Sequence, residues 1–403
     1  MDVFETWFTV PTQGRHAPLK FGRDARHRNV GRRRDMKFRL AASALAIATL
    51  IAACGGASNT PTPSASGNAC FPVKGKCPGE ATALNGAGAT FPAVIYSKWI
   101  DEYNRLTGVQ INYQSIGSGG GIKSITDKTV DFGASDGPMT DQQLADAKAP
   151  ILHIPMVMGA VVPTYNVPGV TQQLKLTPEA LSGIFLGTIT KWNDPKITGS
   201  NSGVTLPDQA ITTVHRSDGS GTTNIFTDYL SKISADWKSK VGAGNSVNWP
   251  SGVGGKGNEG VAGSVKQQPY SIGYVELIYA IQNKLGYAQM QNAKGKFVEP
   301  NLDSVSKAAQ GITLAPDLRV SITNSDNADA YPISGFTWIL AYQEMSDQPK
   351  ALALTRYLWW SITDGQAFTK DLGYAPLPTE VVGKAQDKIR SITSGGTAVL
   401  PKG

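Results

Sequence analysis

Histidine and cysteine, which build most metal centres and many nucleophilic active sites, are scarce in this sequence of 403 residues. There are three cysteines and four histidines, and two of the histidines, His16 and His27, fall within the first 35 residues. That leaves His153 and His215. With Cys54 set aside as a lipidation site (see below), no further cysteine and no nearby histidine completes a ligand set around Cys70 and Cys77. We therefore expect no metal site and no cofactor. The absence of a Walker sequence also argues against a nucleotide-binding P-loop.

An excess of positive charge is missing from most of the chain. The formal net charge is +7, but ten of the 38 Lys and Arg residues and only four of the 31 Asp and Glu residues lie in residues 1–53. The rest of the chain has 28 basic and 27 acidic residues, a net charge of +1. Because nucleic-acid binding depends on a basic surface, we expect no nucleic-acid partner.

Residues 36–53 have the form of a signal peptide. A basic start, Met36 to Arg39, precedes an apolar run, Leu40 to Ala53, that is too short to span a bilayer. The run ends in Ile-Ala-Ala-Cys54, which resembles the lipobox of bacterial lipoproteins. In that family the chain is cut before the cysteine and lipid is attached to it, so Cys54 is the predicted lipidation site. Residues 1–35 are then a non-native extension, unless this basic segment is genuinely translated.

Residues 54–79 are predicted to be a lipidated tether with a small disulfide loop. Residues 55–69 are rich in Gly, Ser, Thr and Pro and have no apolar period, as in a flexible linker. With Cys54 acylated, Cys70 and Cys77 are the remaining thiols. In an oxidising compartment their pairing would contribute about 2–3 kcal/mol. The expected location is the periplasm, anchored by lipid to a bacterial membrane, with the choice between inner and outer membrane left open.

The stretch from Val214 to Thr222 combines a cation, a carboxylate, two glycines and several hydroxyl groups. Apolar residues at helical spacing begin at Ile225, which puts a helix N-terminus just before them. Free N–H groups and the helix dipole favour an anion there. The residues at this N-terminus are Ser220, Gly221 and Thr222. Arg216 can add a bidentate grip on an oxyanion; the alternative is a polar turn in which Arg216 and Asp218 neutralise each other.

Similar glycine-containing turns occur nearer the start of the domain. Residues 84–92 lead into a predicted helix over 93–107, with Thr90 as a candidate N-cap. A strand over 109–113, a glycine turn over 117–121, a helix over 122–128 and a strand over 130–136 then predict a βαβ unit. Ligands of such sheets collect at the C-terminal ends of the strands, where Ser118 and Asp136 lie.

The uncharged run 151–162 predicts buried strands that pass from one domain into another. The later patterns predict helices over 177–186, 224–230 and 350–362, a strand running into a helix over 271–280, and returning strands over 331–333 and 336–342.

Two stretches that resemble enzyme motifs lack a required part of the motif. Gly252, Gly254 and Gly257 satisfy G-x-G-x-x-G, but no hydrophobic strand directly precedes them, so dinucleotide binding is not expected. Ser220 lies in Asp-Gly-Ser-Gly and lacks the G-x-S-x-G elbow of hydrolases. His215 is interpreted as an outward-facing strand residue.

Four separated motifs together resemble motifs of the phosphate-binding protein of the bacterial high-affinity phosphate ABC transporter. They are GAGATFP (86–92), IGSGGG (116–121), VDFGASD (130–136) and RSDGSGT (216–222), and the similarity runs from about Ala83 nearly to the C-terminus. The family implies an α/β, two-lobed periplasmic-binding-protein fold with a hinged ligand cleft. Lobe I would be residues 80–160 and 332–403, lobe II residues 161–331, and the hinges would lie near 157–162 and 331–336.

The resemblance also implies the site and the partners. By the motif match, phosphate contacts fall on Thr90, Phe91 (through its backbone), Ser118, Asp136, Arg216, Asp218, Ser220, Gly221 and Thr222. Gly119 stands where family members often have a second serine, which puts a side-chain contact there in doubt. The implied protein is a monomer and not an enzyme. It binds inorganic phosphate and delivers it to membrane permease subunits that work with a cytoplasmic ATPase.

The chemistry of Asp136 agrees with this assignment. Phosphate near neutral pH carries a proton, whereas sulfate carries none. A buried carboxylate would accept the phosphate O–H but would face sulfate with two unpaired acceptors. Two other interpretations stay open: a phosphohydrolase using Ser220 with His215 or Arg216, and a binder of another oxyanion such as arsenate, or a scavenging or sensing protein without its own permease.

Overall fold

The computed structural model describes residues 70–400. The extension 1–35, the signal peptide 36–53, the lipidation site Cys54 and the tether up to Ala69 lie outside the described residues, so these assignments stay predictions.

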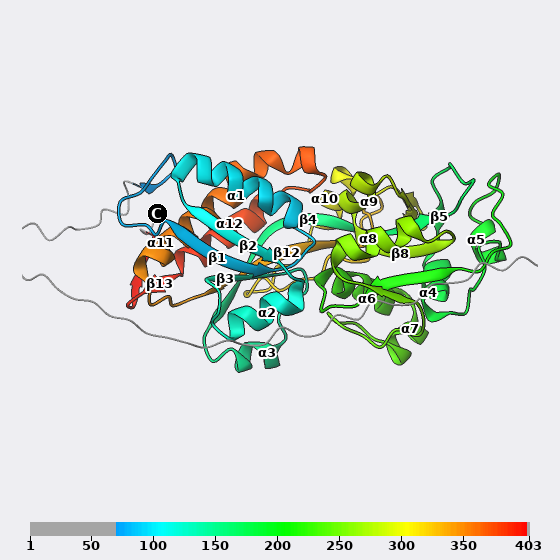
Figure 1. The fold of residues 1–403 in the computed structure, drawn as a ribbon, viewed down its shortest axis with the longest axis horizontal. Coiled ribbons are helices and arrows are strands. Elements are labelled where there is room, and N and C mark those ends of the chain that lie inside the picture. Colours follow the sequence, from blue (N-terminus) through cyan, green and yellow to red (C-terminus); the bar gives the residue numbers. More distant parts are fainter. Residues whose placement is uncertain (1–69, 401–403) are drawn as a thin grey trace, which may run out of the picture. The chain divides into compact units, whose positions relative to one another are not determined.

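A nine-stranded mixed sheet runs through the described residues (Figure 1). Its strand order is β2-β1-β3-β12-β4-β8-β6-β7, and β9 pairs with β4 at the side of this path. The strands are β1 (Ala83–Gly88), β2 (Gln110–Ser115), β3 (Phe132–Ser135), β4 (Ile151–Asn166), β6 (Thr212–Arg216), β7 (Val253–Gly255), β8 (Ser271–Glu276), β9 (Gly286–Tyr287) and β12 (Ser334–Tyr342). The smaller strands are β5 (Lys175–Leu176), β10 (Gln289–Gln291) and β11 (Phe297–Val298) in one sheet and β13 (Thr393–Ser394) and β14 (Thr397–Ala398) in another.

The long strand β4 belongs to both parts of the main sheet. Residues 151–160 pair antiparallel with β12, and residues 161–166 pair antiparallel with β8. All of its residues except Asn166 are buried, as a strand covered on both faces requires. The prediction of buried strand over 151–162 is therefore confirmed. We call β2-β1-β3-β12 with the start of β4 the first part, and the end of β4 with β8-β6-β7 the second part.

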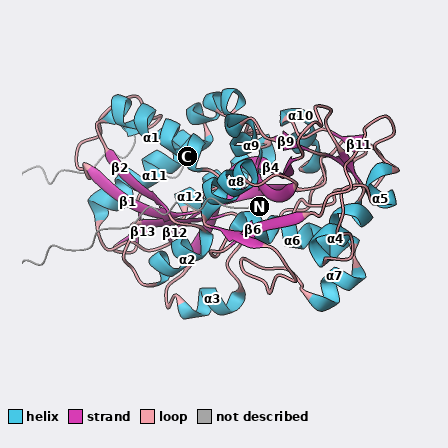
Figure 2. Cartoon of the chain, turned by 45° about the vertical axis from the view of Figure 1, so that its right-hand side comes forward, coloured by secondary structure: helices cyan, strands magenta, loops and turns pink. Residues whose placement is uncertain are grey.

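Helices flank both parts of the sheet (Figure 2). Figure 1 shows α1 on one side of β1 and β2, and α2 on the other side, against β3. The helices of the first part are α1 (Ala93–Thr107), α2 (Ser118–Thr126), α3 (Asp141–Asp146), α11 (Gln348–Ile362), α12 (Thr379–Arg390) and the 3-10 turns η2 (Asp364–Phe368) and η3 (Lys370–Leu372). Those that follow β4 are α4 (Pro178–Leu186), α5 (Pro195–Thr198), α6 (Gly221–Ile233), α7 (Ala235–Lys240), α8 (Gly257–Gln267), α9 (Leu277–Asn283) and α10 (Leu302–Ala308).

Two sequence-based expectations about helix starts are wrong. Thr90 does not cap α1, because Pro92 holds the N-cap position and no side chain makes the cap hydrogen bond. The predicted glycine turn 117–121 is mostly helix, since α2 begins at Ser118 and not at Ile122. By contrast, α6 begins at Gly221 with Ser220 as its N-cap, as the sequence predicts.

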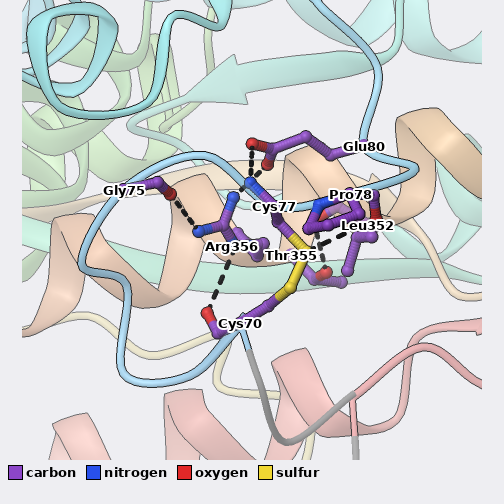
Figure 3. The surroundings of a disulfide bond; sticks show 8 residues. All are labelled: Cys70, Gly75, Cys77, Pro78, Glu80, Leu352, Thr355 and Arg356. Atoms are coloured by element: carbon purple, nitrogen blue, oxygen red, sulfur yellow. Dashed lines mark hydrogen bonds and ion pairs between the residues drawn. A yellow bond between two sulfur atoms is a disulfide. The ribbon is translucent and has the colours of Figure 1, made fainter. Parts of the chain in front are cut away.

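The start of the described chain is fixed against α11 (Figure 3). Cys70 and Cys77 form a disulfide bond with their Cα atoms 5.5 Å apart. The buried Arg356 of α11 pairs with Glu80 and donates to the carbonyl oxygen of Gly75 over 2.6 Å and that of Cys70 over 3.3 Å. Arg356 therefore satisfies two carbonyl groups within the small loop and holds the loop against the first part of the domain.

The helices in the described part of the chain include none that is both long and apolar enough to cross a membrane.

Candidate anion-binding site

The predicted contacts converge from two directions. Thr90 and Phe91 follow β1, Ser118 opens α2 and Asp136 follows β3, all in the first part. Arg216 ends β6 and the remaining contacts lead into α6, in the second part. Hydrogen bonds join the two sets, so residues about 100 positions apart in the sequence lie side by side. The structure thus brings the predicted residues together.

Asp136 is a buried carboxyl group at the centre of this arrangement. Its Oδ1 accepts a hydrogen bond from Thr337 over 2.8 Å, and Ser118 donates weakly to its Oδ2 over 3.4 Å. Burial raises the pKa of Asp136 to about 7, against the opposing effects of the Thr337 hydroxyl, the Arg216 charge and Ser118. Near neutral pH this group can therefore either accept or donate a proton.

Arg216 and Asp218 form a bidentate ion pair. The guanidinium donates from Nε to Oδ1 over 2.8 Å and from Nη2 to Oδ2 over 2.6 Å. Burial alone would raise the pKa of Asp218, but the hydrogen bonds and charge of Arg216 outweigh burial and lower it. The carboxylate is thus ionised at neutral pH. It offsets the buried Arg216 charge, and Nη1 is left to face Thr222 over 3.4 Å.

The N-terminus of α6 lies directly against Asp136. Ser220 caps the helix by accepting from the Thr223 backbone N–H over 3.0 Å. A Cβ atom on Gly221 would come within 2.6 Å of the Asp136 carboxylate, so only glycine allows this approach. The backbone N–H of Gly221 donates to the Ser118 hydroxyl over 2.9 Å. The positive end of the helix dipole therefore faces the centre of the site.

Gly119 is already engaged in the contact between the two parts. Its backbone N–H donates to the carbonyl oxygen of Gly219 over 2.8 Å. A Cβ atom on Gly119 would lie 3.0 Å from the Gly219 Cα atom. The two loops touch through glycine backbone, in a space that a side chain would enter only by displacing a neighbour.

Thr90 and Phe91 are held by groups that the sequence patterns did not single out. Tyr279 donates to the Thr90 carbonyl oxygen over 2.5 Å, and Tyr374 donates to that of Phe91 over 2.7 Å. The Thr90 hydroxyl accepts from the side chain of Asn258 over 2.8 Å. With both carbonyl groups satisfied, this turn is fixed in one orientation.

Four residues that hydrogen-bond to the predicted contacts were not predicted from the sequence: Asn258, Tyr279, Thr337 and Tyr374. Asn258 directly follows the glycine-rich segment 252–257 and lies in the first turn of α8, so that segment was a usable signal. The other three lie far in sequence from the motifs, and only the fold brings them together.

A cavity of about 150 Å³ adjoins Asp136. Its lining includes Asn224, Arg319, Thr323 and Ser334, but Asp136 is the only predicted contact among the lining residues. The other predicted contacts therefore do not line this cavity. Among residues 70–400 no three His, Cys, Asp or Glu side chains are grouped as metal ligands.

His215 does not form a catalytic pair with Ser220 in the described structure. Its ring stacks on Trp249 with centroids 4.9 Å apart, and its Nδ1 donates to the Arg216 carbonyl oxygen over 3.1 Å. The Ser220 hydroxyl accepts from the backbone of α6 instead. The geometry thus shows no activated nucleophile of the Ser–His kind.

The fold and this arrangement of donors define a class, the α/β binding domains. The model of the PBP superfamily domain matches residues 62–364. A protein from Pasteurella multocida named phosphate-binding protein PstS is 47% identical over 310 residues, which cover 76% of this chain and 90% of that protein. One of the same name from Xylella fastidiosa is 47% identical over 306 residues, covering 75% and 84%. The chain therefore belongs to the PBP superfamily and, within it, to the PstS family of phosphate-binding proteins.

A solved structure shares the fold. It is described as a high affinity periplasmic phosphate-binding protein (PfluDING) bound with phosphate at pH 8.5. It is 21% identical, with a TM-score of 0.63, and the match covers 78% of this chain and 96% of that one. The α/β periplasmic-binding-protein fold and the family resemblance predicted from the sequence are thus confirmed.

Proposed function

We propose that this chain binds inorganic phosphate outside the cytoplasm and delivers it to the permease subunits of an ABC transporter. The observation that carries the proposal is the buried carboxyl group of Asp136, which lies beside groups that can donate hydrogen bonds to an anion. These groups are Arg216, the N-terminus of α6 and the neighbouring hydroxyl groups. A bound anion would take over donors that now pair with one another, such as the Gly221 N–H. The names of the relatives support the same ligand and confirm the expectation of a binding protein and not an enzyme.

The finer parts of this proposal concern the site and the setting. The nine predicted residues would contact phosphate, with Asp136 accepting the phosphate O–H. The two parts of the sheet would act as lobes I and II. They would close about residues 331–336 and about residues 157–162, where β4 passes from the first part to the second; we call this passage the β4 crossover. The protein would be a periplasmic monomer anchored through lipid on Cys54, and its permease would work with a cytoplasmic ATPase.

The test is calorimetric titration of the purified, ligand-stripped protein with phosphate and then sulfate from pH 5 to pH 9. We expect saturable 1:1 binding of phosphate, with sulfate silent at pH 8 and above, where Asp136 is mostly ionised and can only accept a hydrogen bond. Asp136→Asn should lose much of the discrimination, because an amide can donate to an unprotonated anion. An unchanged preference in this variant would remove the proton-based mechanism, and equal binding of both anions by the wild type would leave a general oxyanion site.

A further inference from the structure

Asn258 connects hydroxyl groups from the two parts of the domain. Its Nδ2 donates to the Thr90 hydroxyl oxygen over 2.8 Å and to the Thr222 hydroxyl oxygen over 3.1 Å. Its backbone N–H also donates to Thr90 over 3.2 Å. The side chain is fully buried, so these bonds do not compete with bulk water.

The orientation of the Asn258 amide is fixed by its other end. Its Oδ1 accepts from the backbone N–H of Glu276 over 2.9 Å. A backbone N–H can only donate, so the oxygen must face Glu276 and the NH₂ group must face the two threonines. The alternative amide orientation would leave two donors facing each other in a buried place.

This orientation determines what the two hydroxyl groups can do. A hydroxyl has one donor and two acceptor positions. On Thr90 both acceptor positions are filled by Asn258. On Thr222 they face Asn258 and, at 3.4 Å, the guanidinium of Arg216. Each hydroxyl is left with its O–H alone to offer.

We propose that Asn258 is a positioning residue that makes Thr90 and Thr222 obligatory hydrogen-bond donors to an acceptor-rich anion. The inference rests on the proposed function and deepens it, because it explains how neutral hydroxyls from both parts become selective for a phosphate-like ligand. Asn258 acts through the threonines and does not itself contact the ligand. Because it also bonds across the two parts, it favours the arrangement in which both hydroxyls reach the same ligand.

The sharpest test is Asn258→Asp. The change keeps an oxygen for the Glu276 N–H but replaces the NH₂ group with an acceptor, toward which both threonine hydroxyls would turn. Phosphate titration should show a rise in Kd of about 100-fold or more at pH 8, the loss expected for two hydrogen bonds to a charged ligand. The ratio of variant to wild-type Kd should shrink toward pH 5, as the introduced carboxyl group becomes protonated.

A matched control separates this effect from general damage. Asn292→Asp makes the same chemical change at a buried asparagine whose Nδ2 donates to the carbonyl oxygens of Ala328 and Ala330, over 2.8 and 3.3 Å. This variant should melt earlier but keep its phosphate Kd within about twofold, because neither partner belongs to the site. An equal loss of affinity in both variants would overturn the proposed role of Asn258.

A double-mutant cycle tests whether Asn258 works through the hydroxyls and not through charge. Asn258→Ala should weaken phosphate binding about tenfold in the wild type, and less than twofold when Thr90→Val and Thr222→Val are already present. The same loss in both backgrounds would show a merely structural role and would overturn the inference alone. If the wild type itself bound no phosphate, the proposed function would fail and this inference with it.

Discussion

At the residue scale, the buried Asp136 makes the stability of the ligand-free protein depend on pH. Its pKa in the folded protein is about 7, above the ordinary value of 3.8. Between these two values the unfolded chain has released the proton while the folded protein still holds it. The free energy of unfolding therefore falls as pH rises from about 4 to about 7. This loss of stability, the penalty for ionising a buried carboxyl group, levels off above the folded pKa of about 7.

Asp136→Asn should remove this penalty, because an amide does not ionise. Relative to the wild type, the ligand-free variant should be equally stable near pH 4 and more stable at pH 8, by an amount on the order of 4 kcal/mol or several degrees in Tm. Denaturant unfolding at both pH values, without phosphate, measures the difference. A stability difference that is the same at pH 4 and pH 8 would contradict the raised pKa.

The residues of the site were only partly predictable. The motif residues were predicted from the resemblance of four motifs to a known family. The types of most of them also suit anion binding: a carboxylate, a guanidinium, hydroxyls and helix-terminal glycines. Thr337, which donates to Asp136, lies 201 positions away in a strand of mostly apolar residues. No local pattern marks such a residue, because its role depends on the pairing of β12 with β3 and not on its neighbours in sequence.

At the scale of the elements, the start of α2 was mispredicted because glycines have two uses. A run of three glycines reads as a turn, yet residues 119–121 lie inside the helix. A Cβ atom on Gly121 would come within 2.5 Å of the Ala134 carbonyl oxygen and 2.6 Å of the Gly88 Cα atom. Glycine is present there because the helix packs directly on β1 and β3, and the sequence does not show how closely two elements approach.

Gly121→Ala and Gly263→Ala form a matched pair that tests this explanation. Both glycines lie in helices, but a Cβ atom on Gly263 in α8 would meet no atom within 4 Å. Gly121→Ala should lower the free energy of unfolding by about 1–3 kcal/mol through overpacking, whereas Gly263→Ala should raise it by about 0.5–1 kcal/mol. Denaturant melts of both variants decide; a stabilising Gly121→Ala would mean that α2 can move away from the sheet at little cost.

At the scale of the whole molecule, the crossover of β4 was predictable and its partners were not. A long uncharged run interrupted only by a proline indicates a strand buried on both sides, and the passage between domains was expected there. The change of partner from β12 to β8 at residues 160 and 161 depends on chain segments more than 100 residues further on. The contact between Gly119 and Gly219, where the two parts touch, is equally remote from any local pattern.

The Gly119–Gly219 contact gives a test of whether ligand binding needs the two parts to come together. Gly119→Val places a branched side chain where even a Cβ atom would lie 3.0 Å from the Gly219 Cα atom. It should weaken phosphate binding by roughly 5- to 150-fold, since overpacking a close contact costs about 1–3 kcal/mol. Calorimetry gives the affinity, and small-angle scattering should show less compaction on adding phosphate than in the wild type.

Gly263→Val is the control for Gly119→Val. It adds the same side chain at a position whose Cβ atom would meet no atom within 4 Å, and it should bind phosphate normally. If Gly119→Val bound phosphate as tightly as the wild type, binding would not require this contact, and closure of the two parts as lobes would have to rest on the β4 crossover alone.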